Sequence, residues 1–226
     1  MCQSSRGALI VIEGLDRAGK STQHARLCQN LESQGHRVNR MRFPDRTTSI
    51  GKSIDAYLKG ESEQEDHVVH LLFSANRWEA ATSIRAAIEE GITVVIDRYY
   101  YSGIVYSAAK GRKDLSLQWA REPEIGLPRP DICLYLDIST EEQAKRGGFG
   151  NEKYETSAMQ ERVRELFYKL QLLPDGQDIQ VIDAGGNVAG VEKDIMERVE
   201  QMMADTRLAE DLRNILPWSE MDHAPS

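Results

Sequence analysis

Several features that define whole classes of proteins are missing from this sequence. It has three cysteines among 226 residues, an odd count without metal-ligand spacing, so we expect neither a disulfide framework nor a zinc site. No apolar run is long enough to cross a membrane, and residues 1–6 are too few and too polar for a secretion signal. Cys28 and Cys133 fall in apolar segments, where we expect buried free thiols of a reducing compartment. We therefore expect an intracellular protein, cytoplasmic, nuclear or both, with no membrane partner.

Positive charge is also scarce. Lys and Arg number 28 against 36 Asp and Glu, and the formal net charge is −8, so we expect no general nucleic-acid partner. Residues 1–60 differ, because they carry ten Lys and Arg against five Asp and Glu. This local basic excess suits a small anionic ligand. The five histidines are scattered along the chain and give no support for a His-based catalytic triad.

A phosphate-binding loop is the most specific feature that is present. Residues 14–21 read GLDRAGKS, follow the apolar segment 8–12 and precede an amphipathic segment at 22–31. Strand, glycine-rich loop and helix in this order are the context that the GxxxxGK[ST] motif requires. Its glycines let backbone N–H groups turn toward a phosphate, Lys20 can reach the β- and γ-phosphates, and Ser21 can ligate Mg²⁺. The sequence therefore predicts a protein that binds a nucleoside triphosphate.

The hydrophobic pattern predicts an α/β fold with a doubly wound, parallel, five-stranded sheet. Five strand-like runs alternate with helical stretches, at residues 8–13, 37–43, 93–97, 132–137 and 179–183. Several of these runs are continuously apolar, as in a parallel sheet that is covered on both faces. The length suits a single domain, residues 1–226, and ligands of such folds gather at the carboxyl ends of the strands.

Two segments are expected to move relative to this framework. The glycine-rich stretch at 146–151 follows a short helical piece, so we expect a mobile lid at about 145–156. The tail at about 207–226 ends in small and polar residues, and we expect it to be flexible.

Charged residues follow two of the predicted strands. Asp97 ends the apolar run 93–97, which is typical of an acid that holds Mg²⁺ in a P-loop protein. Arg98 follows at once, and Arg46 lies in the loop after the second strand, where each guanidinium can bind a phosphate. The alternatives are an ordinary strand-end ion pair for Asp97 and a plain surface position for Arg46.

Two further pairs of residues lie four positions apart and so face the same side of a helix. Phe73 can stack on a flat base, and Arg77 can donate to a base oxygen; the alternative is a core Phe73 and a surface Arg77. Ser102 and Tyr106 can face the same cavity, with a helix cap and a core tyrosine as their alternatives.

Taken together, these residues resemble the eukaryotic type of thymidylate kinase, to which the human enzyme belongs. The resemblance spans nearly all of residues 6–200. The matching motifs are RGALIV at 6–11, the loop with Asp16-Arg17, Arg42-Phe43-Pro44 with Arg46, HLLFSANRWE at 70–79, Asp97-Arg98-Tyr99 with Ser102-Gly103, GLP at 126–128 with Pro130-Asp131, and the lid at 145–155. The resemblance implies a P-loop nucleoside monophosphate kinase fold and transfer of the γ-phosphate of Mg-ATP to dTMP, giving dTDP. It also implies a homodimer, with ATP and dTMP as small-molecule substrates and Mg²⁺ as cofactor.

The family's functional residues carry over to specific positions of this chain. The resemblance assigns catalysis to Arg17, Lys20 and Asp97, and Mg²⁺ binding to Ser21 and Asp97. It assigns ATP binding to Gly14, Arg17, Ala18, Gly19, Lys20, Ser21, Thr22, Arg146 and Gly186. It assigns dTMP binding to Asp16, Phe43, Arg46, Phe73, Arg77, Arg98, Ser102, Gly103, Tyr106 and Tyr154.

Three competing functions stay open at this stage. A nucleoside kinase on the same fold would phosphorylate a nucleoside that has no 5′-phosphate. A GTPase-type switch would need both a DxxG and an NKxD motif. The sequence has a DxxG at 183–186 but contains no NKxD. A nucleotide-binding pseudokinase is opposed by intact Arg17, Lys20, Ser21 and Asp97. One departure from the family is Lys153, where relatives often have arginine, and this weakens any bidentate contact there.

Overall fold

A computed structural model of the chain describes residues 6–146, 153, 154, 156–204 and 206–221. These residues contain a five-stranded, all-parallel sheet in the order β2-β3-β1-β4-β5. The strands are β1 (Leu9–Gly14), β2 (Val38–Arg42), β3 (Thr93–Asp97), β4 (Ile132–Asp137) and β5 (Ile179–Asp183). Each strand lies in or within one residue of an expected run, so the predicted parallel α/β sheet is confirmed.

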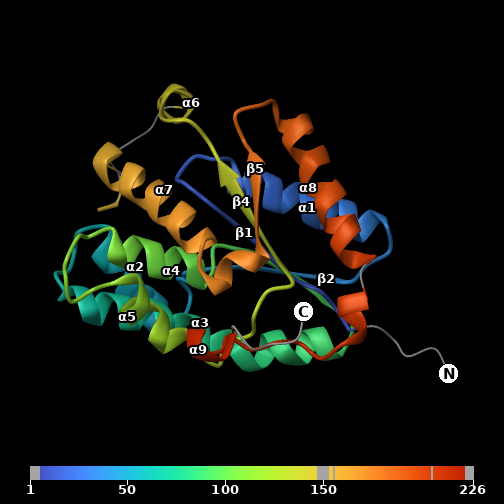
Figure 1. The fold of residues 1–226 in the computed structure, drawn as a ribbon, viewed down its shortest axis with the longest axis horizontal. Coiled ribbons are helices and arrows are strands. Elements are labelled where there is room, and N and C mark those ends of the chain that lie inside the picture. The colour runs from blue at the N-terminus through green and yellow to red at the C-terminus, as the bar shows by residue number, and fades with distance from the viewer. Residues whose placement is uncertain (1–5, 147–152, 155, 205, 222–226) are drawn as a thin grey trace.

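Helices cover both faces of this sheet (Figure 1). The α-helices are α1 (Lys20–Ser33), α2 (Ser49–Leu58), α3 (Asp66–Glu89), α4 (Tyr100–Ala108), α5 (Leu117–Arg121), α6 (Thr140–Lys145), α7 (Ser157–Gln171), α8 (Val188–Met203) and α9 (Trp218–Met221). Helices α1 and α8 pack together on one face, and α3, α4 and α7 lie on the other. In the part of the chain that the structure describes, no helix is long and apolar enough to cross a membrane.

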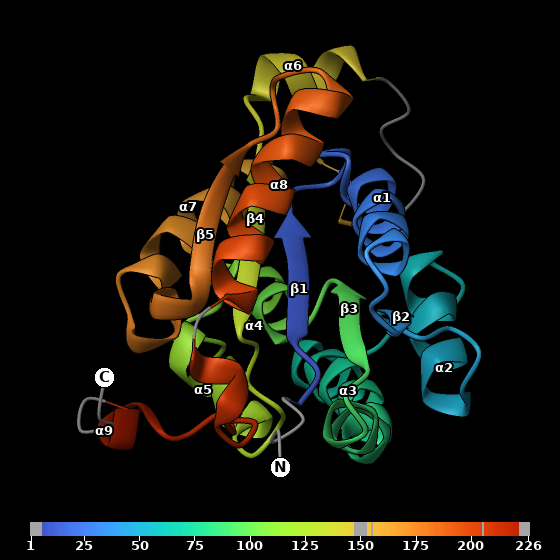
Figure 2. The ribbon, with the colours of Figure 1, turned by 90° about the vertical axis from the view of Figure 1, so that its right-hand side faces the viewer.

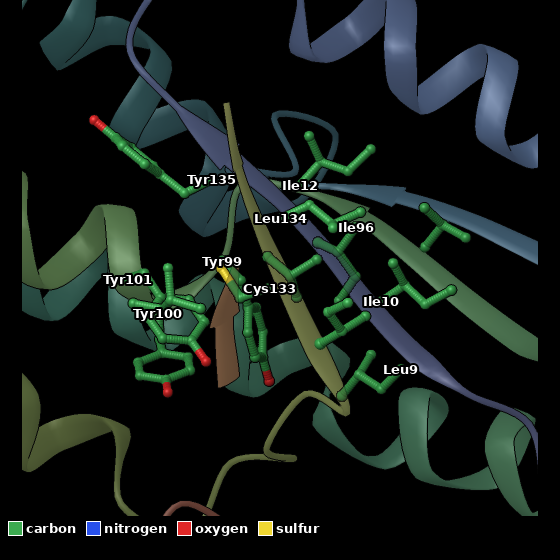
Figure 3. Close-up of a cluster of buried hydrophobic side chains, with 14 of the residues drawn as sticks. Leu9, Ile10, Ile12, Ile96, Tyr99, Tyr100, Tyr101, Cys133, Leu134 and Tyr135 are labelled. Carbon is green, nitrogen blue, oxygen red and sulfur yellow. The ribbon is translucent and has the colours of Figure 1, made fainter. Parts of the chain in front are cut away.

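The core lies on both sides of the central strands. All six residues of β1 are buried, and their side chains meet those of β3 and β4 (Figure 3). Continuous burial of this kind explains the apolar runs, because each side chain of a central parallel strand faces a helix layer. Cys28 and Cys133 are buried free thiols, as expected. The core therefore holds the carboxyl ends of β1 and β3 rigidly, and these ends carry the candidate site.

Residues 206–221, which follow α8, pack against the body of the protein. Figure 2 shows them at the end of the sheet opposite to the carboxyl ends of the strands. Ile215 is fully buried, and its backbone exchanges hydrogen bonds with Gly126 and Leu127 at 2.8 and 2.9 Å. The Trp218 indole N–H donates to Asp175 at 2.5 Å. Residues 208–221 therefore contact the body of the protein, residues 222–226 lie outside the described part, and the flexibility expected of the tail stays a prediction. Most of the expected lid, residues 147–152 and 155, also lies outside it.

Candidate active site

The phosphate loop connects β1 to α1 in a conformation that glycine makes possible. Gly14 and Gly19 have φ values of 144° and 92°, and a Cβ at Gly14 would come within 2.5 Å of the Leu136 carbonyl oxygen. Lys20 lies buried beneath the loop, where its Nζ donates to the Leu15 carbonyl at 2.6 Å. Burial lowers the pKa of Lys20 to about 7. A phosphate bound to the loop would place a negative charge beside Lys20 and favour its charged form.

Ser21 and Asp97 meet at the point where the loop faces β3. The Ser21 hydroxyl donates to Asp97 Oδ2 at 3.0 Å. Burial alone would raise the pKa of Asp97, but Lys20, Arg98 and Arg42 outweigh it and lower the pKa, so the carboxylate is ionised. Arg42 Nη2 donates to Ser21 Oγ at 2.6 Å and to Asp97 Oδ2 at 2.8 Å. A hydroxyl and an ionised carboxylate oxygen side by side fit Mg²⁺, which takes few protein ligands when it also binds phosphates.

Arg98 and Asp16 form an ion pair across the mouth of this loop. Arg98 has φ 66°, and its Nη1 also donates to Ser102 Oγ at 3.0 Å. The second oxygen of Asp16 accepts from Gln160 Nε2 at 2.7 Å and from the Tyr106 hydroxyl at 3.3 Å. Burial opposes ionisation of Asp16, yet Arg98 and Lys20 lower its pKa overall. The carboxylate is thus held in place by groups from α4, from α7 and from the connection between β3 and α4.

Glu13 supports this arrangement from below. It is fully buried, and burial raises the pKa of its carboxyl group. The carboxyl accepts from the backbone N–H groups of Tyr99 and Ser102 at 2.8 and 3.0 Å, and from the Ser102 hydroxyl. These bonds tie the first turn of α4 to β1, and so they fix Arg98 and Ser102 relative to the phosphate loop.

A cavity of about 820 Å³ opens beside these groups. All ten residues that were predicted to bind dTMP line it, together with Arg17, Lys20, Ser21 and Asp97. Its size is in the usual range of small-molecule sites. Phe73 lines the cavity and is half-buried, whereas Arg77 is buried with 2% exposure. The alternative of a core Phe73 and a surface Arg77 is therefore wrong.

The far end of the cavity is built around Arg77. Arg77 Nε donates to Glu124 Oε2 at 2.8 Å and Nη2 donates to Glu124 Oε1 at 2.5 Å. Gly103 lies against this guanidinium, and a Cβ there would come within 2.6 Å of Nη2. The glycine is needed so that α4 can approach Arg77 closely.

Comparison with known proteins gives a consistent result. The sequence pattern of the thymidylate kinase family matches residues 12–195. The thymidylate kinase of Homo sapiens is 47% identical over 191 residues, which cover 84% of this chain and 88% of that protein. The thymidylate kinase of Danio rerio is 46% identical and covers 88% of this chain and 92% of that protein. The chain belongs to the thymidylate kinase family.

A solved structure supports the same assignment. A structure of the thymidylate kinase from Candida albicans has a TM-score of 0.82 at 36% identity, and the match covers 93% of this chain and 98% of that one. The predicted nucleoside monophosphate kinase fold is thereby confirmed.

The remaining predicted ATP-binding residues lie in the phosphate loop or next to it. Arg146 bridges two segments, because Nη1 donates to the Arg17 carbonyl at 3.0 Å and Nη2 to the Ala184 carbonyl at 2.7 Å. Gly14, Ala18 and Gly19 belong to the loop itself, next to the cavity lining. Thr22 and Gly186 are exposed and do not line the described cavity.

Two of the described lid residues, Lys153 and Tyr154, lie against α2 and α4. The Lys153 backbone N–H donates to the Leu58 carbonyl at 3.2 Å, and its Nζ pairs with Glu63 at 2.9 Å. The Tyr154 ring lies 5.6 Å from that of Tyr106. Lys153 therefore makes a point-charge contact here, as lysine can, rather than a bidentate one.

Five residues that shape the site were assigned no function from the sequence. They are Glu13, Arg42, Glu124, Gln143 and Gln160. A carboxylate inside an apolar strand was an available signal for Glu13, and position at a strand end was one for Arg42. The others act across 47 to 144 residues of chain, and nothing local in the sequence indicates such contacts.

Proposed function

We propose that this protein transfers the γ-phosphate of ATP to dTMP, giving dTDP and ADP. The observation that carries the proposal is the shared cavity, because groups suited to an acceptor nucleotide line the same space as Arg17 and Lys20 of the phosphate loop. Membership of the thymidylate kinase family supports the same reaction. The homologous proteins bear the name thymidylate kinase.

The reaction requires positive charge more than proton transfer. The second pKa of a phosphate monoester is about 6, so the attacking oxygen of dTMP is already anionic at neutral pH and needs no general base. Two anions must still be brought together, and charge spreads over the transferring group in a loose transition state. Arg17 and Lys20 stabilise this charge, while Arg46 and Arg98 hold the acceptor phosphate. Asp16 would bind the sugar, and Tyr106 would exclude a ribose 2′-hydroxyl.

Ser21 and Asp97 would hold Mg²⁺ at the loop. Bound there, Mg²⁺ supplies charge neutralisation between the β- and γ-phosphates of ATP. Among the described residues, no group of three or more His, Cys, Asp or Glu side chains could hold a metal ion. The ATP phosphates would therefore complete the coordination.

Thymine would be recognised at the far end of the cavity. Phe73 offers a ring for stacking, and Arg77 has a free pair of donors on Nη1 for a carbonyl oxygen of the base. Cytosine presents an amine where thymine presents O4, so dCMP would leave donors of Arg77 unpaired and is rejected strongly. Uracil lacks only a methyl group, which is worth about 1–3 kcal/mol, so dUMP is a poor substrate.

We also propose that the protein forms a homodimer through α3. Val68, Leu71 and Trp78 are 43%, 46% and 42% exposed. Their spacing of three and seven positions places them on one stripe of the helix. An apolar stripe of this kind on a helix surface suits contact with a second copy of the chain.

The protein is also proposed to be intracellular, because Cys28 and Cys133 are buried free thiols.

One turnover assay tests the proposed reaction. The protein is incubated with Mg-ATP, and ADP release is followed with dTMP, dUMP, dCMP, AMP or thymidine as the acceptor. We expect strong turnover with dTMP, weak turnover with dUMP and none with the other three. Turnover of thymidine would instead indicate a nucleoside kinase. ATP binding without turnover of any acceptor would indicate a pseudokinase.

A further inference from the structure

Arg77 and Glu124 form a completely buried ion pair at the base end of the cavity. The exposed fractions of the two side chains are 2% and 0%. Both bonds of the pair, from Nε and Nη2, use the same edge of the guanidinium, and such a bidentate contact fixes the plane of both groups. Among the described residues, Glu124 is the only hydrogen-bond partner of the Arg77 side chain. Nη1 makes no hydrogen bond with the described residues, and because Arg77 lines the cavity, this nitrogen is available to a ligand there.

Glu124 is itself anchored to the helix that carries Arg77. It follows Pro123 in a short 3₁₀ turn, Glu122–Glu124. The Pro123 carbonyl accepts from the Trp78 indole N–H at 2.8 Å and from the Ser74 hydroxyl at 3.3 Å. Ser74 and Trp78, which flank Arg77 in α3, thus hold the turn in place. The Glu124 carboxylate therefore has a fixed position, and its two bonds orient Arg77.

The pair also matches the charge of what it faces. A pyrimidine base is neutral, whereas an arginine without a counter-ion prefers a phosphate or carboxylate. Glu124 lies behind Arg77 and outside the cavity lining. It cancels the charge of the guanidinium without competing for the donors of Nη1. The pair therefore presents fixed donors that carry no net charge.

We propose that Glu124 is a positioning residue that sets the discrimination between thymine and cytosine by fixing Arg77. This rests on the proposed function, in which Arg77 reads the base. With Glu124 in place, the Nη1 donors are held where they can bond to O4 of thymine. The amine of cytosine is itself a donor and cannot accept these bonds. Without the carboxylate, the guanidinium is free to turn, and it can then tolerate the amine.

The test compares Glu124→Gln with a matched control elsewhere in the protein. Arg121 and Asp175 form a second buried bidentate pair, with 3% and 0% exposure and bonds of 2.6 and 3.1 Å, and neither lines the cavity. Asp175→Asn therefore makes the same chemical change away from the base. Both variants are checked for folding, and kcat and KM are measured with dTMP and with dCMP.

For Glu124→Gln we expect the KM for dTMP to rise about tenfold or more, with kcat changed about twofold at most. A contact that is made equally in the ground state and the transition state acts in this way. We also expect the ratio of kcat/KM for dTMP over dCMP to fall about tenfold or more. Glu124→Asp keeps the charge on a shorter side chain and should recover part of the ratio. Asp175→Asn should lower thermal stability and leave the ratio unchanged.

An unchanged ratio in folded Glu124→Gln overturns the proposal, and so does an equal fall in Asp175→Asn. If Glu124→Gln does not fold, Glu124→Asp decides, because its shorter side chain cannot make both bonds to Arg77 at the present distances. A ratio equal to that of the unmodified enzyme would then rule out positioning by Glu124. A failure of the proposed function is distinct, since the unmodified enzyme would then show no turnover of dTMP at all.

Discussion

Binding of ATP should be accompanied by uptake of a proton at Lys20. The ammonium is buried beneath the phosphate loop, and burial lowers its pKa to about 7. At pH 8, one unit above this pKa, roughly nine-tenths of the unliganded protein carries a neutral Lys20. Phosphates bound to the loop strongly favour the charged form. Lys20 should therefore take up about 0.9 proton when ATP binds at pH 8, and only about 0.1 at pH 6.

The same linkage sets the pH dependence of affinity and of stability. Above pH 7, ATP affinity should fall toward tenfold per pH unit, which is about 1.4 kcal/mol per unit. Between pH 7 and 10.5, the unfolded chain binds more protons at this lysine than the folded chain does. The contribution of Lys20 therefore stabilises the unliganded protein progressively as the pH rises through that window. Asp16 and Asp97 have lowered pKa values and stay ionised, so they do not titrate there.

Isothermal titration calorimetry measures the uptake directly. ATP is titrated at pH 6 and pH 8 in pairs of buffers with different ionisation enthalpies, and the dependence of the observed heat on buffer gives the number of protons. Lys20→Arg is the control, because a guanidinium stays charged throughout this range and should show almost no uptake. No buffer dependence at pH 8, or equal uptake in Lys20→Arg, would refute the reasoning.

Two further substitutions test other parts of the site and fold. Arg17→Ala should lower kcat by about 10³ or more and weaken ATP binding far less, because an arginine at the transferring group acts mainly in the transition state. Steady-state kinetics together with an ATP-binding titration checks this prediction. An unchanged kcat would exclude a catalytic role for Arg17. Ile215→Ala should lower the free energy of unfolding by about 2–5 kcal/mol, since the side chain is fully buried. Urea unfolding measures the loss, and a change below about 0.5 kcal/mol would mean that the tail does not contribute to the core.

Local patterns were sufficient for the sheet and for the phosphate loop. The apolar run that ends at Asp97 predicted β3 and its acidic end, because burial on both faces leaves a continuous signal in the sequence. Lys20 and Ser21 could be assigned because the motif fixes their spacing. Four-residue spacing placed Phe73 and Arg77 on one side of α3, but it could not decide which of them was buried.

Contacts between distant segments were beyond such patterns. Gln160 reaches Asp16 across 144 residues, and Glu124 reaches Arg77 across 47. The tail was expected to be flexible because its composition is mixed and polar. In the structure it is held by contacts with distant segments, among them the buried side chains of Leu208 and Ile215 and the acceptor that Asp175 offers to Trp218. Single contacts of this kind leave no periodicity that a sequence analysis could detect.

The cavity must distinguish the two ends of one small anion. Seven basic and three acidic residues line it among the part of the chain that the structure describes, so its field attracts the phosphate of an acceptor strongly. An uncompensated arginine at the base end would compete for that phosphate and favour a reversed, unproductive orientation. Glu124 removes this competition from outside the cavity, because it neutralises Arg77 and leaves Nη1 available. Attraction at one end and neutral hydrogen bonding at the other would then orient the nucleotide before any transfer takes place.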